Sequence, residues 1–339
     1  MYRLINRIMI TGIAGFLGSH LSDFFLMKGY EVIGIDDLST GNMDNVSPLV
    51  EFHKWDINSQ SLKNLMSGCD VVVHCAAAAY EGVSVFSPSF ISKNIYAGSA
   101  NVFSAAIHSG VKRIVNTSSM ARFGNGHPAP FRETGTCNPV DPYGLAKYSA
   151  DKLLTMLAEI HGIQYSIAVP HNIYGPRQLY TDPGRNVAAI MTNRMLQGKQ
   201  PIIYGDGTQV RCFSYVHDVV PFLAKMCLDD AYNGQTINLG PDRGEVTINE
   251  LAEILADIIG FKLDPIYMPG RPQEVKHAIC SSDLARKILG FKESTDLRDG
   301  LTQMVNYIQK KGPKPFSYGH INLEIINNRT PKTWTDKLI

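Results

Sequence analysis

Tyr143 and Lys147 are the residues of this sequence whose spacing most directly indicates chemistry. Residues four apart in a helix lie on the same face, so the Lys147 ammonium can lie next to the Tyr143 phenol. A nearby positive charge favours the phenolate and so lowers the pKa of the phenol. A tyrosine tuned in this way exchanges a proton with a substrate hydroxyl near neutral pH. We therefore predict that Tyr143 is a general acid/base and that Lys147 tunes it.

Two serines precede this pair in the segment Asn116-Thr-Ser-Ser-Met-Ala-Arg-Phe-Gly124. Ser118 and Ser119 follow a predicted strand, and in an open α/β sheet the carboxyl ends of the strands face the ligand crevice. A hydroxyl there can hydrogen-bond the same substrate oxygen as the tyrosine. We predict this role for Ser119, whereas Ser118 also fits a hydroxyl that only satisfies its own loop.

A glycine-rich turn near the start of the chain predicts a dinucleotide site. Gly12, Gly15 and Gly18 follow a predicted strand and open a helix. Glycine lets the backbone approach a pyrophosphate, which sits at the helix N-terminus. Asp36 ends the next strand, where a carboxylate binds both hydroxyls of an adenosine ribose and repels a 2′-phosphate, which favours NAD over NADP. A dinucleotide supplies the hydride chemistry that side chains lack.

Each of these motifs has a simpler explanation when it is taken alone. About one Tyr-x-x-x-Lys is expected by chance at this composition, and a glycine turn also makes a tight strand–helix connection. Asp56, at the end of the third predicted strand, fits a helix N-cap as well as a contact to adenine. The order of the motifs along the chain is what favours the functional interpretation. The ten histidines show no metal-ligand spacing, so we expect no metal site and place His74 in the core.

Composition excludes several classes of function. The 339 residues carry 32 Lys and Arg against 31 Asp and Glu, which indicates no nucleic acid polymer as a partner. The longest apolar runs, such as 71–79, are too short to span a bilayer, and residues 1–10 look like a first strand, not a signal peptide. Six cysteines without a Cys-x-x-Cys pair indicate reduced thiols. We therefore expect a cytoplasmic protein that does not bind a membrane.

The order of predicted elements indicates an α/β fold. Strands are expected at 7–10, 31–35, 50–55, 70–75, 112–116 and 164–169, and they alternate with helices that include 89–109 and 143–161. This alternation, with nearly continuous apolar strands, predicts a Rossmann-type doubly wound parallel sheet. After a loop at 172–178, helices at 186–197, 247–259, 282–289 and 296–311 and a strand at 202–204 predict a smaller α/β substrate-binding cap domain, whereas a helix at 217–229 and a strand at 235–239 are expected to return to the first sheet.

Three regions are expected along the chain. An NAD-binding domain covers 1–170 and has returns near 215–240, and a substrate-binding domain covers 171–214 and 241–312. The tail at 313–339 contains prolines and is expected to wrap the surface. The sequence indicates no function for this tail.

The motifs taken together resemble one family. Their order is Thr11-Gly-x-x-Gly-Phe-x-Gly18, Asp36-Asp-Leu, Asp56-Ile, His74-Cys-Ala-Ala77, Ser118-Ser119, Tyr143-x-x-x-Lys147, Asn172-Ile-Tyr-Gly-Pro-Arg177 and Arg211-Cys-Phe-Ser-Tyr-Val-His-Asp218. This order resembles the extended short-chain dehydrogenase/reductase family. Within it, the chain is similar to the NAD-dependent nucleotide-sugar epimerases and dehydratases, of the UDP-glucose 4-epimerase kind, from about residue 5 to about residue 310.

The resemblance implies a role for each matching residue. Tyr143, Lys147 and Ser119 would be catalytic, with Ser119 on the sugar O4 and Lys147 also on the nicotinamide ribose. The implied NAD-binding residues are Gly12, Gly15, Phe16, Leu17, Gly18, Asp36, Asp56, Ile57, Ala76, Ala77, Asn94, Ser118, Tyr143, Lys147 and Pro170. The implied residues for the nucleotide-diphosphate sugar are Ser84, Ser119, Asn172, Asn186, Val187, Arg211, Arg271 and Glu274. The two arginines would pair with the diphosphate, although they also fit surface charges.

The resemblance also implies a reaction. Dehydratases of this family carry Asp-Glu directly after the catalytic hydroxyl, and the related decarboxylases carry Glu where Ala121 stands. Here the positions are Met120-Ala121, which provide no acid/base for elimination at C5 and C6. The match is therefore better to a 4-epimerase, in which Tyr143 takes the O4 proton, a transient 4-keto sugar turns over, and hydride returns to its other face.

Two alternatives remain beside the epimerase. One is a 4-dehydrogenase that releases the keto form of a nucleotide-linked hexose or heptose. The other is a non-catalytic NAD-binding sensor, which would not need Ser119, Tyr143 and Lys147. Departures from the family pattern are Pro170-His171 and Phe123. The resemblance further implies a homodimer formed through the helices near 90–108 and 145–160.

Overall fold

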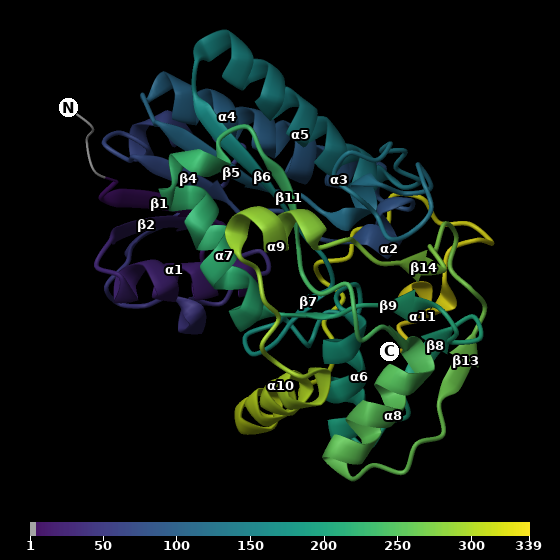
Figure 1. Ribbon diagram of the computed structural model, residues 1–339. Coiled ribbons are helices and arrows are strands. Elements are labelled where there is room, and N and C mark those ends of the chain that lie inside the picture. The colour runs from purple at the N-terminus through teal and green to yellow at the C-terminus, as the bar shows by residue number, and fades with distance from the viewer. Residues whose placement is uncertain (1–4) are drawn as a thin grey trace.

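Seven parallel strands form the central sheet of the structure, a computed structural model that describes residues 5–339 (Figure 1). In sheet order the strands are β11 (Thr236–Leu239), β6 (Gln164–Pro170), β5 (Arg113–Thr117), β4 (Val71–His74), β1 (Arg7–Thr11), β2 (Glu31–Asp36) and β3 (Glu51–Lys54). The order reverses between β1 and β4, and ligands of open α/β sheets bind at such a switch point. The predicted Rossmann-type sheet is confirmed. Residues 1–4 of the predicted first-strand segment lie outside the described residues.

Helices cover both faces of this sheet because its strands are apolar on both sides. Val71 and Val73 of β4 pack with the helices α1 (Phe16–Met27), α7 (Val216–Leu228) and α9 (Asp283–Leu289). Val72, between them, packs on the opposite face with α4 (Gly98–His108) and α5 (Pro142–His161). Successive side chains of a strand point to opposite faces, so one short apolar strand supports two cores.

The helix predicted at 89–109 is divided into three parts. It consists of α3 (Pro88–Ile91), the π-helical turn η3 (Ser92–Ala97) and α4, and Gly110 ends it with a φ of +71°. The wider turn of a π-helix often marks a functional site, and Asn94 lies within it. Other short helices are η1 (Met43–Asn45), η2 (Leu62–Leu65), α2 (Glu81–Ser84), η4 (Met120–Arg122), η5 (Asp230–Tyr232) and α11 (Lys332–Thr335).

A second lobe lies below the carboxyl ends of the strands in Figure 1. It has its own core, formed by the helices α6 (Val187–Leu196), α8 (Ile248–Ile259) and α10 (Leu297–Lys311). Three small sheets join it: β7 (Ile173–Tyr174) with β10 (Ser214–Tyr215), β8 (Ile202–Tyr204) with β13 (Ile266–Met268), and β9 (Val210–Arg211) with β12 (Val246–Thr247) and β14 (His277–Ala278). The segment predicted as a loop at 172–178 thus contains β7, which is too short for a periodic pattern to show.

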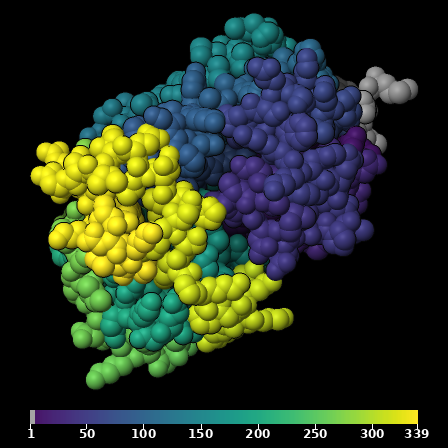
Figure 2. Space-filling model, turned by 180° about the vertical axis from the view of Figure 1, so that it is seen from behind, coloured from purple at the N-terminus to yellow at the C-terminus, as the bar shows by residue number. Residues whose placement is uncertain are grey.

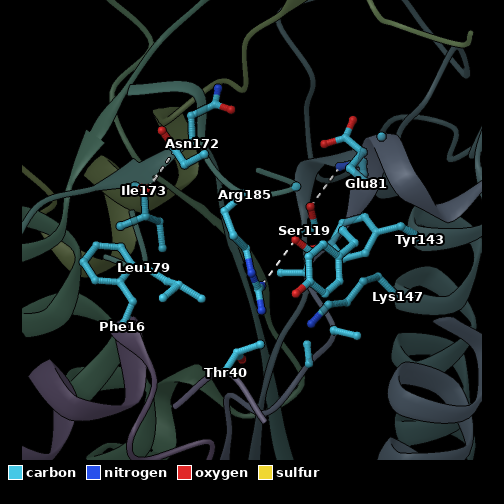
Figure 3. Close-up of a pocket in the computed structure, with 18 of the residues that line it drawn as sticks. Phe16, Thr40, Glu81, Ser119, Tyr143, Lys147, Asn172, Ile173, Leu179 and Arg185 are labelled. Carbon is cyan, nitrogen blue, oxygen red and sulfur yellow. Dashed lines mark hydrogen bonds between the residues drawn. The ribbon is translucent and has the colours of Figure 1, made fainter. Parts of the chain in front are cut away.

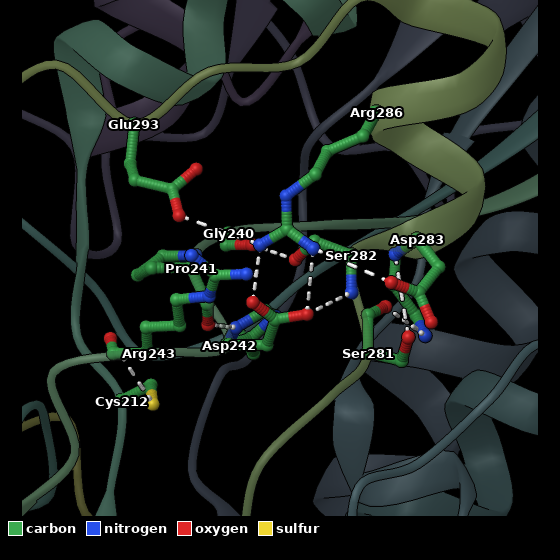
Figure 4. Close-up of polar contacts among 12 residues, drawn as sticks. Cys212, Gly240, Pro241, Asp242, Arg243, Ser281, Ser282, Asp283, Arg286 and Glu293 are labelled. Carbon is green, nitrogen blue, oxygen red and sulfur yellow. Dashed lines mark hydrogen bonds and ion pairs between the residues drawn. The ribbon is translucent and has the colours of Figure 1, made fainter.

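A charged cluster fastens the chain where it passes from the central sheet to the second lobe (Figure 4). Asp242 follows β11, and both of its carboxylate oxygens accept hydrogen bonds from the Arg286 guanidinium of α9. The same carboxylate accepts the Ser282 N–H at 2.9 Å. Burial alone would raise the pKa of Asp242, but Arg286 and the Ser282 N–H outweigh burial and hold this pKa below its usual value.

The tail at 313–339 lies across both lobes, as the yellow segment in Figure 2 shows. Its helix α11 places Trp334 in a core cluster with Tyr80 and Phe86 of the first lobe. Among residues 5–339, no helix has the length and apolarity required to cross a membrane. All six cysteines lie in this described range and carry free thiols.

Candidate active site

A cavity of about 780 Å³ opens between the two lobes at the carboxyl ends of the central strands. All of the predicted site residues except Ser84 line it. Ser84 is fully buried, and its hydroxyl donates to the backbone oxygen of Glu81 at 2.6 Å. Ser84 therefore packs behind the cavity wall and does not line the space that a sugar could occupy.

The glycine turn between β1 and α1 forms the floor of the cavity. Gly12 has a φ of +71°, and a Cβ atom there would lie 2.8 Å from the backbone of Ala76. A Cβ on Gly18 would lie 2.3 Å from the Gly12 carbonyl oxygen. Gly15 is the N-cap of the twelve-residue α1, which has no acidic residue in its first turn. This bare helix N-terminus fits a pyrophosphate, because its N–H groups and dipole favour an anion.

His74 supports this floor from inside the protein. Its Nδ1 hydrogen-bonds the Thr11 hydroxyl at 2.7 Å, its Nε2 hydrogen-bonds Ser99 at 3.0 Å, and burial lowers its pKa to about 3. The Thr11 hydroxyl in turn accepts the Ala76 N–H at 3.2 Å. The prediction of a core histidine is confirmed, and the histidine holds Ala76 beside Gly12.

Asp36 ends β2 at the edge of the glycine turn. Its two carboxylate oxygens accept the N–H groups of Ala14 at 3.0 Å and Leu38 at 2.9 Å, and burial raises its pKa. Each carboxylate oxygen has a second lone pair, so the group can also accept two ribose hydroxyls. Asp56 lies further along the same wall, where its carboxylate accepts the Asn58 N–H at 2.8 Å. The glycine turn and Asp36 together fit the diphosphate and ribose of a dinucleotide.

Tyr143, Lys147 and Ser119 meet in the middle of the cavity (Figure 3). Tyr143 begins α5, and burial raises its pKa to about 12, whereas a hydrogen bond from Ser119 and the nearby Arg185 act to lower it. Lys147, one turn further along α5, donates to the Thr117 carbonyl at 2.7 Å. Burial lowers the pKa of Lys147 to about 8, so its ammonium form still dominates at neutral pH. In this arrangement Ser119 and Arg185 act to lower the pKa of the phenol, and the tuning of Tyr143 by Lys147 stays a prediction.

The two adjacent serines have different partners. Ser119 is the N-cap of η4, where its oxygen accepts the Ala121 N–H at 3.2 Å. Ser118 donates its hydroxyl to the buried carboxylate of Asp151, which also forms an ion pair with Arg122 at 2.9 Å. Ser118 thus belongs to a buried network that reaches α5, beyond its own loop, and it also lines the cavity, so its contact with NAD stays a prediction.

Two arginines and a glutamate line the far end of the cavity. The Arg271 guanidinium donates to Glu274 at 3.0 Å and lies over the ring of Tyr204, 4.8 Å from its centroid. Arg211 lies 3.9 Å from the same carboxylate. Burial would raise the pKa of Glu274, but Arg271 outweighs burial and lowers it. The two guanidinium groups fit the oxygens of a diphosphate, although the Glu81 carboxyl also lies within their electrostatic reach.

The second lobe adds two asparagines to the wall. Asn172 adopts a φ of +44°, and its side chain donates to the Cys212 carbonyl at 2.9 Å. Asn186 caps α6 by accepting the Ala188 N–H at 2.9 Å, which places Val187 at the start of that helix. A positive φ at a residue other than glycine persists where the surrounding structure imposes it, and such residues cluster at ligand sites.

Several lining residues were not predicted from the sequence. Glu81 and Arg185 enter the cavity beside the catalytic group (Figure 3). Burial and Asp141 raise the pKa of Glu81, whereas Arg211 and Arg271 oppose them. A charged residue within the small apolar segment 76–87 was a signal for Glu81, but nothing local marks Arg185 or the tail residues His320, Asn322 and Ile339, which also line the cavity. Within residues 5–339, no three His, Cys, Asp or Glu side chains group as metal ligands do.

Comparisons with known proteins agree with this geometry. The family model described as "NAD dependent epimerase/dehydratase family" matches residues 8–240. The chain is 34% identical over 307 residues to a putative UDP-glucose 4-epimerase of Methanocaldococcus jannaschii, which covers 89% of this chain and 98% of that protein. It is 28% identical to the UDP-glucuronate 4-epimerase of Thermodesulfobacterium geofontis, over 88% of this chain and 95% of that protein.

A solved structure gives the same result. The UDP-glucose 4-epimerase of Thermotoga maritima, crystallised with UDP-glucose, superposes with a TM-score of 0.84 at 33% identity and covers 90% of this chain and 99% of its own. Fold, site geometry and sequence similarity lead to one conclusion: the chain belongs to the NAD dependent epimerase/dehydratase family, and NAD is its cofactor.

Proposed function

We propose that this protein is a nucleotide-sugar 4-epimerase that acts through a transient 4-keto sugar. One observation carries the proposal: Tyr143, Ser119 and Lys147 lie in one cavity. The glycine turn with Asp36, which fits a dinucleotide, lines one end of this cavity, and Arg211 with Arg271 lines the other. A sugar held by its diphosphate at the arginines would place its ring beside Tyr143. UDP-sugars are the first substrates to test, because the similar proteins are named UDP-sugar epimerases.

The proposed mechanism assigns each residue a part. When bound, NAD accepts a hydride from C4 of the sugar and returns it. Tyr143 takes the O4 proton and gives it back, and Ser119 holds O4 by a hydrogen bond. Deprotonation of Tyr143 requires nearby positive charge, because burial raises its pKa to about 12. The ammonium of Lys147 and the guanidinium of Arg185 supply that charge.

The loop beside Ser119 favours epimerisation over elimination. Met120 and Ala121 line the cavity without a carboxylate, and Ala278 is a small residue on the wall of the second lobe. The sugar must turn over between hydride removal and hydride return, which small apolar side chains permit. Glu81 and Asp141 are acidic groups that line the cavity near Tyr143, so the products must be identified directly.

Proton NMR of the purified protein with a panel of UDP-, GDP- and dTDP-sugars, without added NAD, tests the proposal. We expect the C4 epimer of one member to appear up to an equilibrium mixture. Tyr143→Phe is the matched control, and it should lose at least about a thousandfold in rate while NAD stays bound. A released 4-keto sugar that requires added NAD would instead indicate a dehydrogenase. If the Tyr143→Phe variant keeps the full biological function of the protein, the protein is a non-catalytic NAD-binding sensor.

Three further proposals follow from the sequence. The two lobes, with separate cores, support a division into an NAD-binding and a substrate-binding domain. Exposed apolar side chains along α5, namely Leu145, Met156 and Ile160, support a homodimer. A cytoplasmic location stays a prediction.

A further inference from the structure

The tail at 313–339 bridges the two lobes at the mouth of the cavity. On the first lobe, the N–H groups of Glu324 and Ile325 donate to the Phe86 carbonyl at 2.9 and 3.0 Å. The Glu324 carboxylate also accepts the Ser89 N–H at 2.9 Å, at the start of α3. On the second lobe, the Lys314 N–H donates to the Asn193 side chain at 3.1 Å. These bonds hold the tail in one place.

A buried anchor fixes the end of the tail. Trp334 is 4% exposed and packs edge to face against Phe86, with 6.0 Å between ring centroids. The neighbouring Thr333 is fully buried, and its hydroxyl bonds the Tyr204 hydroxyl. Burying an aromatic side chain of this size stabilises the folded state, so this end of the tail belongs to the folded core.

The anchor shares two neighbours, Gly82 and Tyr204, with the arginine at the far end of the cavity. A Cβ atom on Gly82 would lie 2.9 Å from the Arg271 guanidinium and 3.5 Å from the Trp334 ring, so both side chains pack on this glycine. Tyr204, which bonds Thr333, carries the Arg271 guanidinium over its ring. The tail therefore packs against Gly82 and bonds Tyr204, the two residues on which the Arg271 guanidinium rests.

Two polar side chains of the tail also line the cavity. His320 and Asn322 stand on its wall together with the terminal Ile339. The Asn322 carbonyl is held by the Ser87 hydroxyl, which fixes the backbone at this point. Within residues 5–339, the side chains of His320 and Asn322 form no hydrogen bond or ion pair to another residue. Their donors and acceptors are thus available to a ligand.

The relatives from M. jannaschii and T. maritima match over 98% and 99% of their own lengths and over 89% and 90% of this chain. About a tenth of this chain therefore lies outside these matches.

We propose that the C-terminal tail is part of the sugar-nucleotide site. His320 and Asn322 hydrogen-bond the bound nucleotide-diphosphate sugar, and Trp334 holds Arg271 in place for its diphosphate. This inference rests on the proposed function, because it takes its ligand from it.

The test is calorimetric binding of the sugar nucleotides of the same panel, with UDP-glucose as the first probe, to the NAD-bound protein. The double variant His320→Ala/Asn322→Ala changes two side chains without hydrogen bonds in the protein, so we expect it to fold. We expect its affinity for the sugar nucleotide to fall about tenfold or more, and KM to rise accordingly with little change in kcat. Its affinity for NAD should stay within about twofold of wild type.

Ile326→Ala is the matched control, because this tail residue is 68% exposed and lies outside the cavity. It should bind the sugar nucleotide as wild type does. Trp334→Ala should weaken sugar-nucleotide binding through Arg271 and also lower the unfolding midpoint. If the double variant binds as tightly as wild type, the tail proposal alone is overturned. If wild type binds no member of the panel, the proposed function fails, and this inference fails with it.

Discussion

The acidity of the Tyr143 phenol is set by groups from four segments of the chain. Burial raises its pKa to about 12, and the negative charges of Glu81 and Asp141 act in the same direction. Ser119 and Arg185 act in the opposite direction. Substitution of any one of these groups should therefore move the pH dependence of the reaction in a direction that is known in advance.

Glu81→Gln and Ser119→Ala should shift the pH profile of turnover in opposite directions. Activity that requires the phenolate rises with pH through the pKa of Tyr143. Removing the Glu81 charge lowers that pKa and moves the profile to lower pH, whereas removing the Ser119 hydrogen bond raises it. Ser119→Ala should also lose about a hundredfold in kcat, because it loses its bond to the substrate. Glu253→Gln, on an exposed part of α8, is the control, and shifts of equal sign would contradict this assignment.

Asp36 should determine the choice between NAD and NADP. Asp36→Asn removes the charge that repels a 2′-phosphate and one acceptor for the ribose hydroxyls. We expect NAD to bind about tenfold more weakly and the preference over NADP to shrink, as measured by titration of each cofactor. Asp37→Asn removes the same charge at the next position, where the carboxylate binds Ser39. If both variants change the binding of NAD and NADP equally, the cofactor preference depends on net charge and not on the position of Asp36.

At the scale of elements, the loops that follow the central strands carry the residues of the site and lead to the second lobe. The seven strands are short, and their carboxyl ends carry the glycine turn, Ser119 and the loop after β11. Asp242 and Arg286 fasten that loop to α9 by a bidentate pair whose carboxylate is mostly buried. Charged hydrogen bonds with this geometry are stronger than exposed ion pairs.

Asp242→Ala should therefore lower the free energy of unfolding by about 1–3 kcal/mol, which thermal denaturation followed by circular dichroism would detect. The pKa of Asp242 is lowered in the folded protein, so its contribution is fully present above the unfolded pKa of about 3.9 and is lost as pH falls through the folded pKa. The difference between variant and wild type should thus shrink below about pH 4. Asp257→Ala is the control, because Asp257 and its partner Arg298 are 69% and 52% exposed, and it should cost at most about 1 kcal/mol. Equal losses would contradict the special role of Asp242.

At the scale of the whole molecule, the outer face of α5 is unusually apolar. Leu145, Met156 and Ile160 are exposed and lie on one side of the helix, while the other side packs on the sheet. Tyr143 and Lys147 lie near the N-terminal end of the same helix, on its buried side, and line the cavity. A dimer through this face would hold α5, and with it the catalytic pair, in a fixed position.

Ile160→Glu should separate such a dimer. Ile160 is 74% exposed, so the substitution leaves the fold intact but places a charge in an apolar interface. We expect light scattering to give the mass of one chain, against two chains for wild type. Met27→Glu, 78% exposed at the end of α1, is the matched control and should leave the mass unchanged. A wild-type protein with the mass of a single chain would contradict the dimer.

The sequence alone was enough to predict the central sheet, the glycine turn and the group formed by Tyr143, Lys147 and Ser119. Each of these depends on local spacing: apolar residues at strand period, glycines where the backbone approaches itself, and two side chains one helical turn apart. The core position of His74 followed in the same way from its apolar strand.

The rest of the site depends on contacts between segments that lie far apart in the sequence. The Glu324 carboxylate accepts a hydrogen bond from Ser89, which lies 235 positions earlier in the chain, and no local sequence pattern predicts such a contact. Ser84 was predicted to touch the sugar, but the packing of α2 turns its hydroxyl inward and places Glu81 in the cavity instead. Arg185, His320 and Asn322 reach the same cavity from the second lobe and the tail. Their positions depend on how separate segments pack together, because side chains far apart in sequence are brought into contact only by burying the apolar surfaces between them.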